Sequence, residues 1–440
     1  MQGFSSAAEP DHQLTPRFFA AAIKGCLRPV QLVMACPTLL FLFALTAMLF
    51  CHPDVPFHKL NRVTFGVLVV GVIGKALVSK HKAVPFERAS WPMIALTMVM
   101  LISLIGRPID DETLGVLGAK YLFPFTLFHV AKHVFTGEKE VRRFEVFALV
   151  VLTYLSFTAI AFLLGAHALV FPKFILDPNL GYHVERARGP FLQAVANGVS
   201  LNMLALLVLH GYRRGSLRSV KTVIVLGSVP LAILATMTRA VWLSFAGSVL
   251  ALLMLSRNRR LRLSLGILLA LGAGGLALAM SATQLGAAVD DRVSQDAPVE
   301  YRKAVYAGGW RMFLDRPLMG WGFHQMPAEL PKYVDEFHEK LLYPHNTYLE
   351  VAVENGLLGL SLYMWLMWEL LRLGSSRLRG QKPHDLLNSE FHRMWPIFLA
   401  VYCVNAAVVV MSYQFVNGLL FSVAGILAAQ RRRAEAVAAC

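Results

Sequence analysis

Residues 343–359, YPHNTYLEVAVENGLLG, mark the place where a long polar segment gives way to an apolar one. The polar side ends in a histidine, His345, followed by Asn346, and the apolar side holds Gly356 with Gly359 one helical turn later. More than sixty residues of loop precede this stretch, and apolar runs make up most of the rest of the chain. We predict that a bundle of membrane helices holds this loop at one face of a bilayer.

The composition of the 440-residue chain identifies its broad class. Apolar residues account for 56% of the chain and charged residues for only 16%. A soluble core cannot hide this much apolar surface, and apolar runs of about 20 residues have the length of a transmembrane helix. Because lipid offers the backbone no hydrogen-bond partners, such runs are helices rather than open sheet. We predict an all-α polytopic membrane protein.

About twelve segments are predicted to cross the membrane. They divide the chain into helices one to nine within residues 1–281, a loop at residues 282–346, and helices ten to twelve with a short tail at residues 347–440. The predicted spans are residues 29–51, 62–79, 90–106, 113–131, 146–165, 191–210, 222–238, 240–255, 263–281, 347–371, 394–411 and 414–430.

The net charge of +15 follows from topology rather than from an acidic partner. Most Lys and Arg residues fall in alternate connections, which the positive-inside rule places in the cytoplasm together with both termini. No nucleic-acid partner is indicated. The loop at residues 282–346 is then on the outer face, where residues 282–344 hold nine acids against seven Lys and Arg. Individual arginines are better site candidates there than bulk charge.

The loop is predicted to fold as a small helical cap. Two helical stretches, Val299 to Leu314 and Glu329 to Leu342, are separated by prolines and glycines between residues 317 and 327. No metal or cofactor is predicted. The five cysteines form no CxxC pair, and the outward acid pairs Asp110-Asp111 and Asp290-Asp291 are better explained as loop and helix-start residues.

Two arginine-bearing turns precede apolar segments. Arg188 stands beside Gly189-Pro190, where its planar guanidinium can bind phosphate oxygens. For Arg186 an ion pair with Glu185 or an interfacial position is the better explanation. Arg239 lies between two apolar runs, and an ionisable group at that depth is a functional hypothesis by default. The alternative is an arginine that caps broken helix ends through backbone carbonyls.

The loop supplies further arginines beside aromatic residues. Arg302 follows Tyr301, and phosphate binding and a surface ion pair with Glu300 are equally compatible with its sequence. Arg311 lies four residues before Asp315, which favours an ordinary surface salt bridge of little energetic weight.

His345 is the best catalytic candidate. Histidine titrates near neutral pH and can accept a proton from a hydroxyl group during nucleophilic attack. His345 also precedes a predicted membrane helix, whose N-terminal end favours bound anions. A capping or interfacial histidine is the alternative explanation from the residues alone.

The spacing His345-Asn346, nine residues, Gly356-x-x-Gly359 resembles the H-[NSQ]-x9-G-x-x-G signature of bacterial O-antigen ligases, members of a wider polymerase and ligase superfamily. The segment FLDRPLMGWGFHQ at residues 313–325 is similar to the superfamily's D-x-P-L-x-G-x-G segment. RGPFLQAVANG at 188–198 and TRAVWLSF at 238–245 resemble its arginine-bearing regions more weakly.

This resemblance implies roles for the matching positions. His345 would be the general base on an acceptor-sugar hydroxyl. Arg188, Arg239 and Arg302 would bind the pyrophosphate of an undecaprenyl-linked glycan, and the acceptor would be lipid A–core at the periplasmic face of the inner membrane. Transfer would be a single inverting step without metal. Asn346, Arg311, Arg186 and Tyr301 are secondary candidates, and Gly356 with Gly359 would let the helix approach a neighbour closely.

Other activities remain open at this point. A polymerase extends one lipid-linked glycan with another, and a protein O-oligosaccharyltransferase modifies protein hydroxyls, although that class usually carries a bulky outward C-terminal region. A twelve-helix transporter tends to have two six-helix halves with its main loop between them. The longest predicted loop here follows span nine and faces outward, which counts against transport. The oligomeric state is left open.

Overall fold

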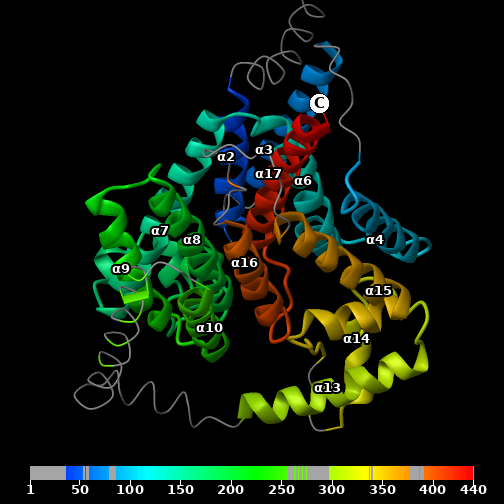
Figure 1. The fold of residues 1–440 in the computed structure, drawn as a ribbon. Helices are drawn as coiled ribbons and strands as arrows, with labels where there is room; N and C mark the ends of the chain where they lie inside the picture. Colours follow the sequence, from blue (N-terminus) through cyan, green and yellow to red (C-terminus); the bar gives the residue numbers. More distant parts are fainter. Residues whose placement is uncertain are drawn as a thin grey trace, which may run out of the picture.

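A computed structural model describes residues 36–52, 55, 59–78, 86–255, 297–335, 337, 340–375, 386 and 391–439, with isolated residues between 259 and 274. Throughout these residues the regular structure is helical. Figure 1 shows a bundle of long helices with α13 lying across the end opposite the C-terminus.

The helices have the following bounds: α2 Pro37–Ala47, η1 Met48–Phe50, α3 Leu60–Val78, α4 Ser90–Ser103, α5 Asp111–Leu117, the π-helical turn η2 Gly118–Leu122, α6 Phe123–Val134, α7 Glu138–Leu163, η3 His167–Leu169, η4 Lys173–Leu176, η5 Gly189–Phe191, α8 Ala194–Arg214, α9 Val220–Ala235, α10 Arg239–Leu255, α13 Ala297–Asp315, α14 Met326–Glu329, η6 Leu330–Tyr333, α15 Thr347–Ser375, α16 Phe391–Ala406 and α17 Gln414–Ala439.

Helices form at the predicted spans wherever the structure describes them. The predicted span at 263–281 lies almost entirely outside the described residues, as do residues 29–35 of the first span. Among the described residues, three helical runs are long and apolar enough to cross a membrane, namely Asp111–Val134, Glu138–Leu163 and Ala194–Arg214, and four others are apolar but shorter. An all-helical membrane architecture is therefore supported, while the number of twelve crossings stays a prediction.

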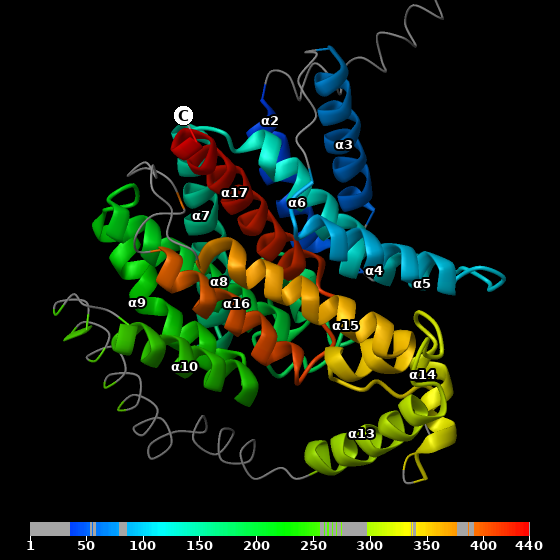
Figure 2. The ribbon, with the colours of Figure 1, turned by 45° about the vertical axis from the view of Figure 1, so that its right-hand side comes forward.

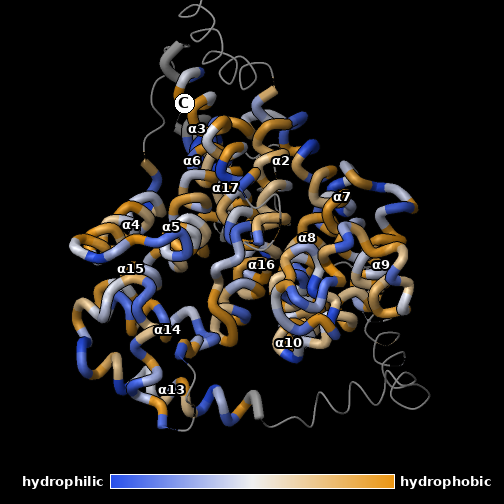
Figure 3. Tube along the Cα trace, turned by 180° about the vertical axis from the view of Figure 1, so that it is seen from behind, coloured by the Kyte–Doolittle hydropathy of each residue, from blue (hydrophilic) through white to orange (hydrophobic). Residues whose placement is uncertain are grey.

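Helices α8 and α17 form the centre of the bundle. Every residue from Phe415 to Ala428 of α17 is buried, and α17 packs along α6. Large apolar side chains such as Ile224, Leu243 and Met254 remain exposed on the outer helices. Figure 3 shows apolar residues along these helices and a mixture of hydrophilic and apolar residues along α13. This pattern is expected where helices face lipid rather than water.

Basic residues from several described segments meet at one end of the bundle. There the arginines near the end of α17 meet residues that precede α4 and follow α6. The contacts are those of Lys132 and Arg432 with Glu87, of Arg433 with the carbonyl of Thr136, and of Arg431 with the carbonyl of Arg372. The loop with α13 lies at the other end (Figure 1). The number of crossings and the orientation of the chain in the membrane stay predictions.

The loop has a small core of its own. Helix α13 covers the predicted stretch Val299 to Leu314, and Val305 and Met312 pack with Leu330 and other apolar residues of the loop. The second predicted loop helix, Glu329 to Leu342, is wrong. Among the described residues of this stretch, α14 and η6 are the helical elements, because the chain folds back so that the Leu342 N–H donates to the Pro327 carbonyl over 3.1 Å.

Helix α15 is bent at Gly356, which has φ 63° and ψ −161°. A residue with a Cβ adopts this conformation only with strain. The bend frees two backbone N–H groups from the helix. Leu357 donates to the Pro317 carbonyl over 2.7 Å, and Leu358 donates to the Leu318 carbonyl over 3.3 Å.

The same loop segment returns two hydrogen bonds to the first half of α15. The Trp321 N–H donates to the Val353 carbonyl over 2.9 Å, and the Gly322 N–H donates to the Glu354 carbonyl over 2.7 Å. A Cβ on Gly320 would collide with the backbone of Glu354. The loop segment at residues 317–322 and the bend of α15 are therefore held together by four backbone hydrogen bonds. Figure 2 shows α15 running from the bundle toward the loop layer.

Candidate functional site

His345 ends the loop in a constrained conformation, with φ 47°. Asn346 caps α15, because its Oδ1 accepts from the N–H groups of Tyr348 and Leu349 over 3.0 and 3.1 Å. The Thr347 hydroxyl donates to a neighbouring carbonyl over 2.9 Å. The backbone that directly follows His345 is thus held in place. The secondary candidate Asn346 has a structural role here as the helix cap.

Several loop residues surround the His345 ring. Arg302 and His183 lie close enough to perturb its charge, and the Tyr301 ring centroid is 6.0 Å away. The Tyr306 hydroxyl lies 3.4 Å from the His345 carbonyl oxygen. The structure therefore brings together His345 with Tyr301 and Arg302, which the sequence places more than forty residues upstream.

The surroundings lower the pKa of His345 below its ordinary value of 6.5. Burial contributes most, followed by the positive charge of Arg302 and then by His183. All three causes disfavour the imidazolium form. His345 is consequently a neutral imidazole near pH 7, which is the form that accepts a proton.

A second loop forms the rim of this site. Tyr182 and His183 lie between η4 and α8, and His183 Nδ1 is 3.2 Å from a Glu185 carboxylate oxygen. Burial, followed by the nearby Glu112 and Tyr182, raises the pKa of Tyr343. Sequence analysis did not single out His183, because a lone histidine in a connection carries no signal of its own.

Arg188 is occupied by the backbone of its own loop. Its side chain is buried, and Nε donates to the Ile175 carbonyl over 3.0 Å. The two terminal nitrogens donate to the carbonyls of Leu180 and Asp177. The guanidinium thus donates to three backbone carbonyls of its own loop, and its contact with pyrophosphate stays a prediction. For Arg186, the ion pair expected with Glu185 is present, at 3.1 Å.

Arg239 is the first residue of α10 and is partly exposed. Its turn lies against the Arg188 turn, because the Ala187 N–H donates to the Ala235 carbonyl over 3.0 Å. One turn further along α10, Ser244 accepts from Asn405 over 3.0 Å. Asn405 lies at the end of α16 where the Tyr306 hydroxyl also approaches. Arg239 therefore belongs to the same end of the bundle as His345.

Arg311 lies away from this arrangement. Its predicted partner Asp315 instead accepts from the Tyr333 hydroxyl over 2.5 Å. Arg311 lies 3.9 Å from Asp335, and both side chains are exposed. A surface ion pair was the expected explanation for Arg311, but its partner was wrong, because the fold of η6 carries Tyr333 to Asp315.

The signature glycines act differently from the prediction. Gly356 is required by its positive φ at the bend rather than by close approach of two helices. A Cβ on Gly359 would collide with the Asn355 side chain of the same helix. Both positions remain structural, and they shape α15 itself.

Loop attachment to the first half of the chain depends on Arg107, which sequence analysis also missed. Arg107 Nη2 donates to the Trp321 carbonyl over 2.8 Å, and its guanidinium packs where a Cβ on Gly322 would lie. The Phe323 N–H donates to Ser103 at the end of α4 over 3.1 Å. The loop is thus joined to α4 as well as to α15.

Metal-ligating residues do not cluster in the described part of the chain. Asp110 caps α5 by accepting from the Thr113 N–H over 2.7 Å, and the hydrogen bonds from Thr113 lower its pKa. This agrees with its expected helix-start role. Asp290 and Asp291 lie outside the described residues.

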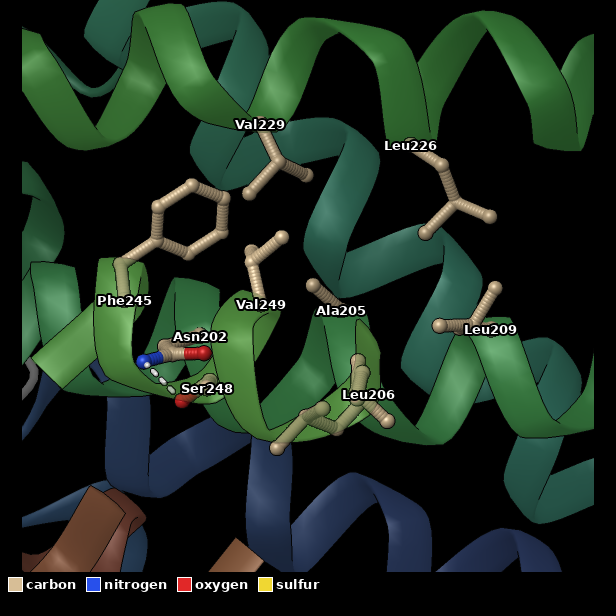
Figure 4. A pocket seen from close by; sticks show the side chains of 10 residues that line it. Asn202, Ala205, Leu206, Leu209, Leu226, Val229, Phe245, Ser248 and Val249 are labelled. Atoms are coloured by element: carbon tan, nitrogen blue, oxygen red, sulfur yellow. Dashed lines mark hydrogen bonds between the residues drawn. The ribbon is translucent and has the colours of Figure 1, made fainter. Parts of the chain in front are cut away.

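A cavity of about 70 Å³ lies between α8, α9 and α10. Its lining is apolar except for Asn202 and Ser248, which are hydrogen-bonded over 3.3 Å (Figure 4). It is separate from the group around His345, since none of its lining residues belongs to the loop.

The fold is that of a multi-pass membrane protein with a polar site where its loop meets the bundle. A family model described as O-antigen ligase matches residues 222–364, a range that contains Arg239, Arg302 and His345. Over this region the chain is similar to the O-antigen ligase family. Arg188 lies outside the matched range. No curated protein matches the chain.

Proposed function

We propose that the protein is an O-antigen ligase. It transfers a glycan from undecaprenyl pyrophosphate to a sugar hydroxyl of lipid A–core, at the periplasmic face of the inner membrane. The supporting observation is the neutral His345 held in a fixed turn beside Arg302, inside the region that matches the family. Such a base suits a reaction in which a hydroxyl group must lose its proton.

The proposed reaction is a single displacement. His345 accepts the proton of the acceptor hydroxyl while the hydroxyl oxygen attacks the anomeric carbon of the donor glycan. The bond between that carbon and the pyrophosphate oxygen breaks, and its electron pair stays on the pyrophosphate. Attack from the opposite side inverts the anomeric configuration.

Arg302 and Arg239 are proposed to stabilise the leaving pyrophosphate. Guanidinium groups bind phosphate oxygens in a bidentate manner, and fixed cations at a developing negative charge accelerate such reactions. Charge stabilisation by arginine then makes the transfer independent of metal. Arg188 is assigned to positioning, because its guanidinium holds the segment that carries Tyr182 and His183.

The direct experiment uses purified protein in nanodiscs with a lipid-linked donor and a lipid A–core acceptor, in buffer containing a chelator. Glycosylated core should appear with inverted anomeric configuration. Chelator-sensitive transfer would contradict metal independence, and retained configuration would contradict the single displacement.

Cells that lack the protein distinguish the ligase from the polymerase of the same superfamily. Loss of the whole polymer ladder from lipopolysaccharide, with accumulation of lipid-linked polymer, supports the ligase. Lipopolysaccharide with a single repeat supports the polymerase.

The proposed orientation is accessible to labelling. Ala328 lies exposed in the loop, so a cysteine introduced there into a variant without native cysteines should react with an impermeant thiol reagent in cells with a permeabilised outer membrane. Reaction only after lysis of the inner membrane would reverse the orientation.

A further inference from the structure

An ion pair inside the bundle connects the two halves of the chain. Lys120 Nζ lies 2.5 Å from Glu350 Oε2, and the side chains are 7% and 5% exposed. The desolvation cost of such a pair is high, and ionisable groups within membrane helices are usually functional. Lys120 also lies outside the region that matches the family.

A local irregularity of the helix places Lys120 in this position. The run from α5 to α6 contains the π-helical turn η2, in which the Phe123 N–H donates to the Gly118 carbonyl five residues back. The Ala119 carbonyl accepts instead from Asn417 of α17 over 2.9 Å. A π-turn holds one residue more than an α-turn, so it changes which side chain faces a neighbouring helix. Pro124, which has no N–H, follows directly.

The partner of Lys120 lies in the helix turn that His345 precedes. The Glu350 N–H donates to the carbonyl of the cap residue Asn346 over 3.0 Å. Glu350 is therefore tied through its backbone to the residue after His345 and through its carboxylate to Lys120. Movement of this carboxylate would turn the start of α15 and redirect the imidazole.

A second acid connects the same lysine to the loop. Glu354 is 2% exposed, interacts electrostatically with Lys120 and Glu350, and lies beside the backbone N–H groups of His324 and Met326. These two residues directly follow the loop segment that joins the bend of α15. One lysine thus faces both the helix that follows the catalytic candidate and the loop turn packed against it.

We propose that Lys120 and Glu350 are positioning residues, with Glu354 as their link to the loop, and that the ion pair fixes the direction of His345. This inference rests on the proposed function for its catalytic consequence. Its physical basis is that small displacements of a reacting group lower the rate strongly, on the order of 10² for about 1 Å.

The experiment compares Lys120→Met with Lys132→Met. Lys132 is a matched control because it is also buried on the α5–α6 run, 3.6 Å from Glu87 at the opposite end of the bundle. Per folded molecule, Lys120→Met should lower kcat by about 10- to 100-fold with the donor KM within about twofold, whereas Lys132→Met should leave both unchanged. Lys120→Arg, which keeps the charge, should recover part of the loss.

A neutral pair keeps the proposal falsifiable if Lys120→Met does not fold. Lys120→Met combined with Glu350→Gln removes both charges of the ion pair, which buried sites tolerate better than removal of one partner. This double variant should show the same loss of kcat. Equal kcat per folded molecule in wild type and double variant would overturn the positioning role.

A readout without transfer separates this inference from the proposed function. Diethyl pyrocarbonate modifies neutral imidazole, and mass spectrometry measures the rate at His345. The rate should change severalfold in Lys120→Met and stay constant in Lys132→Met, whether or not the wild type transfers glycans. An unchanged rate in both variants would contradict the inference, and an inactive wild type would contradict the function alone.

Discussion

Arg188 and His345 stand in comparable turns at the same end of the bundle. Each precedes a long helix of the bundle, α8 or α15, and each turn contains a residue with positive φ, Gly189 at 56° and His345 at 47°. The Arg188 guanidinium donates hydrogen bonds to three carbonyls of its own loop. The His345 ring instead faces Arg302 and His183. The polar groups of Arg188 are therefore used within its own loop, whereas His345 lies near charged side chains from distant segments.

The largest expected effect comes from His345→Ala. Loss of the general base should lower the transfer rate on the order of 10²–10⁴, because the acceptor hydroxyl then has no positioned group to take its proton. Donor binding and the thermal unfolding temperature should be retained. The measurement is single-turnover transfer in nanodiscs. A near-normal rate of His345→Ala would show that His345 is not the general base.

Arg302→Ala should follow, with a loss on the order of 10²–10³ by analogy with removal of one charge-stabilising donor. Arg302→Lys should recover little, since a point charge does not reproduce bidentate phosphate binding. The matched control is Arg311→Ala on the same helix, whose exposed pair with Asp335 should contribute little to stability or rate. Equal losses in Arg302→Ala and Arg311→Ala would place Arg302 outside the site.

Arg188→Ala should act on stability rather than on chemistry. Its removal leaves buried carbonyls without donors, at about 3 kcal/mol in the free energy of unfolding. The thermal unfolding temperature should fall clearly, while kcat per folded molecule changes less than in Arg302→Ala. Unfolding followed in detergent, together with titration of active sites, separates the two. A fully stable but inactive Arg188→Ala would restore Arg188 as a pyrophosphate ligand.

The pH dependence of the rate gives the smallest effect. In the proposed mechanism the neutral form of His345 accepts the proton, so the rate should be level near pH 7 and fall as pH decreases through a pKa below 6.5. In Arg302→Ala the loss of a neighbouring positive charge should move this decrease to higher pH. Rates across pH 4.5–8 (roughly the range that brackets the histidine pKa) measure both profiles. An unshifted profile would separate Arg302 from His345.

The sequence located most of the helices because their signal is local. The apolar segment 146–165 identifies α7 from its own residues alone. The failed helix at Glu329 to Leu342 depended on a contact that its own residues do not reveal, the return of Leu342 to Pro327. Lys120 illustrates the same limit. A lysine in an apolar segment, with acids at 350 and 354 in another, indicates a buried partner, but the pattern does not say which acid meets it.

By itself the sequence determined the membrane class and the position of most of the described helices, since the length of an apolar run acts without reference to distant residues. It also marked His345 through the residues that follow it. Only the tertiary structure decided that Arg188 serves its own loop, that Gly356 bends α15 to receive residues 317–322, and that Lys120 meets Glu350. Each of these depends on hydrogen bonds or charges whose partners are brought together by packing, and partner choice is not encoded in either segment alone.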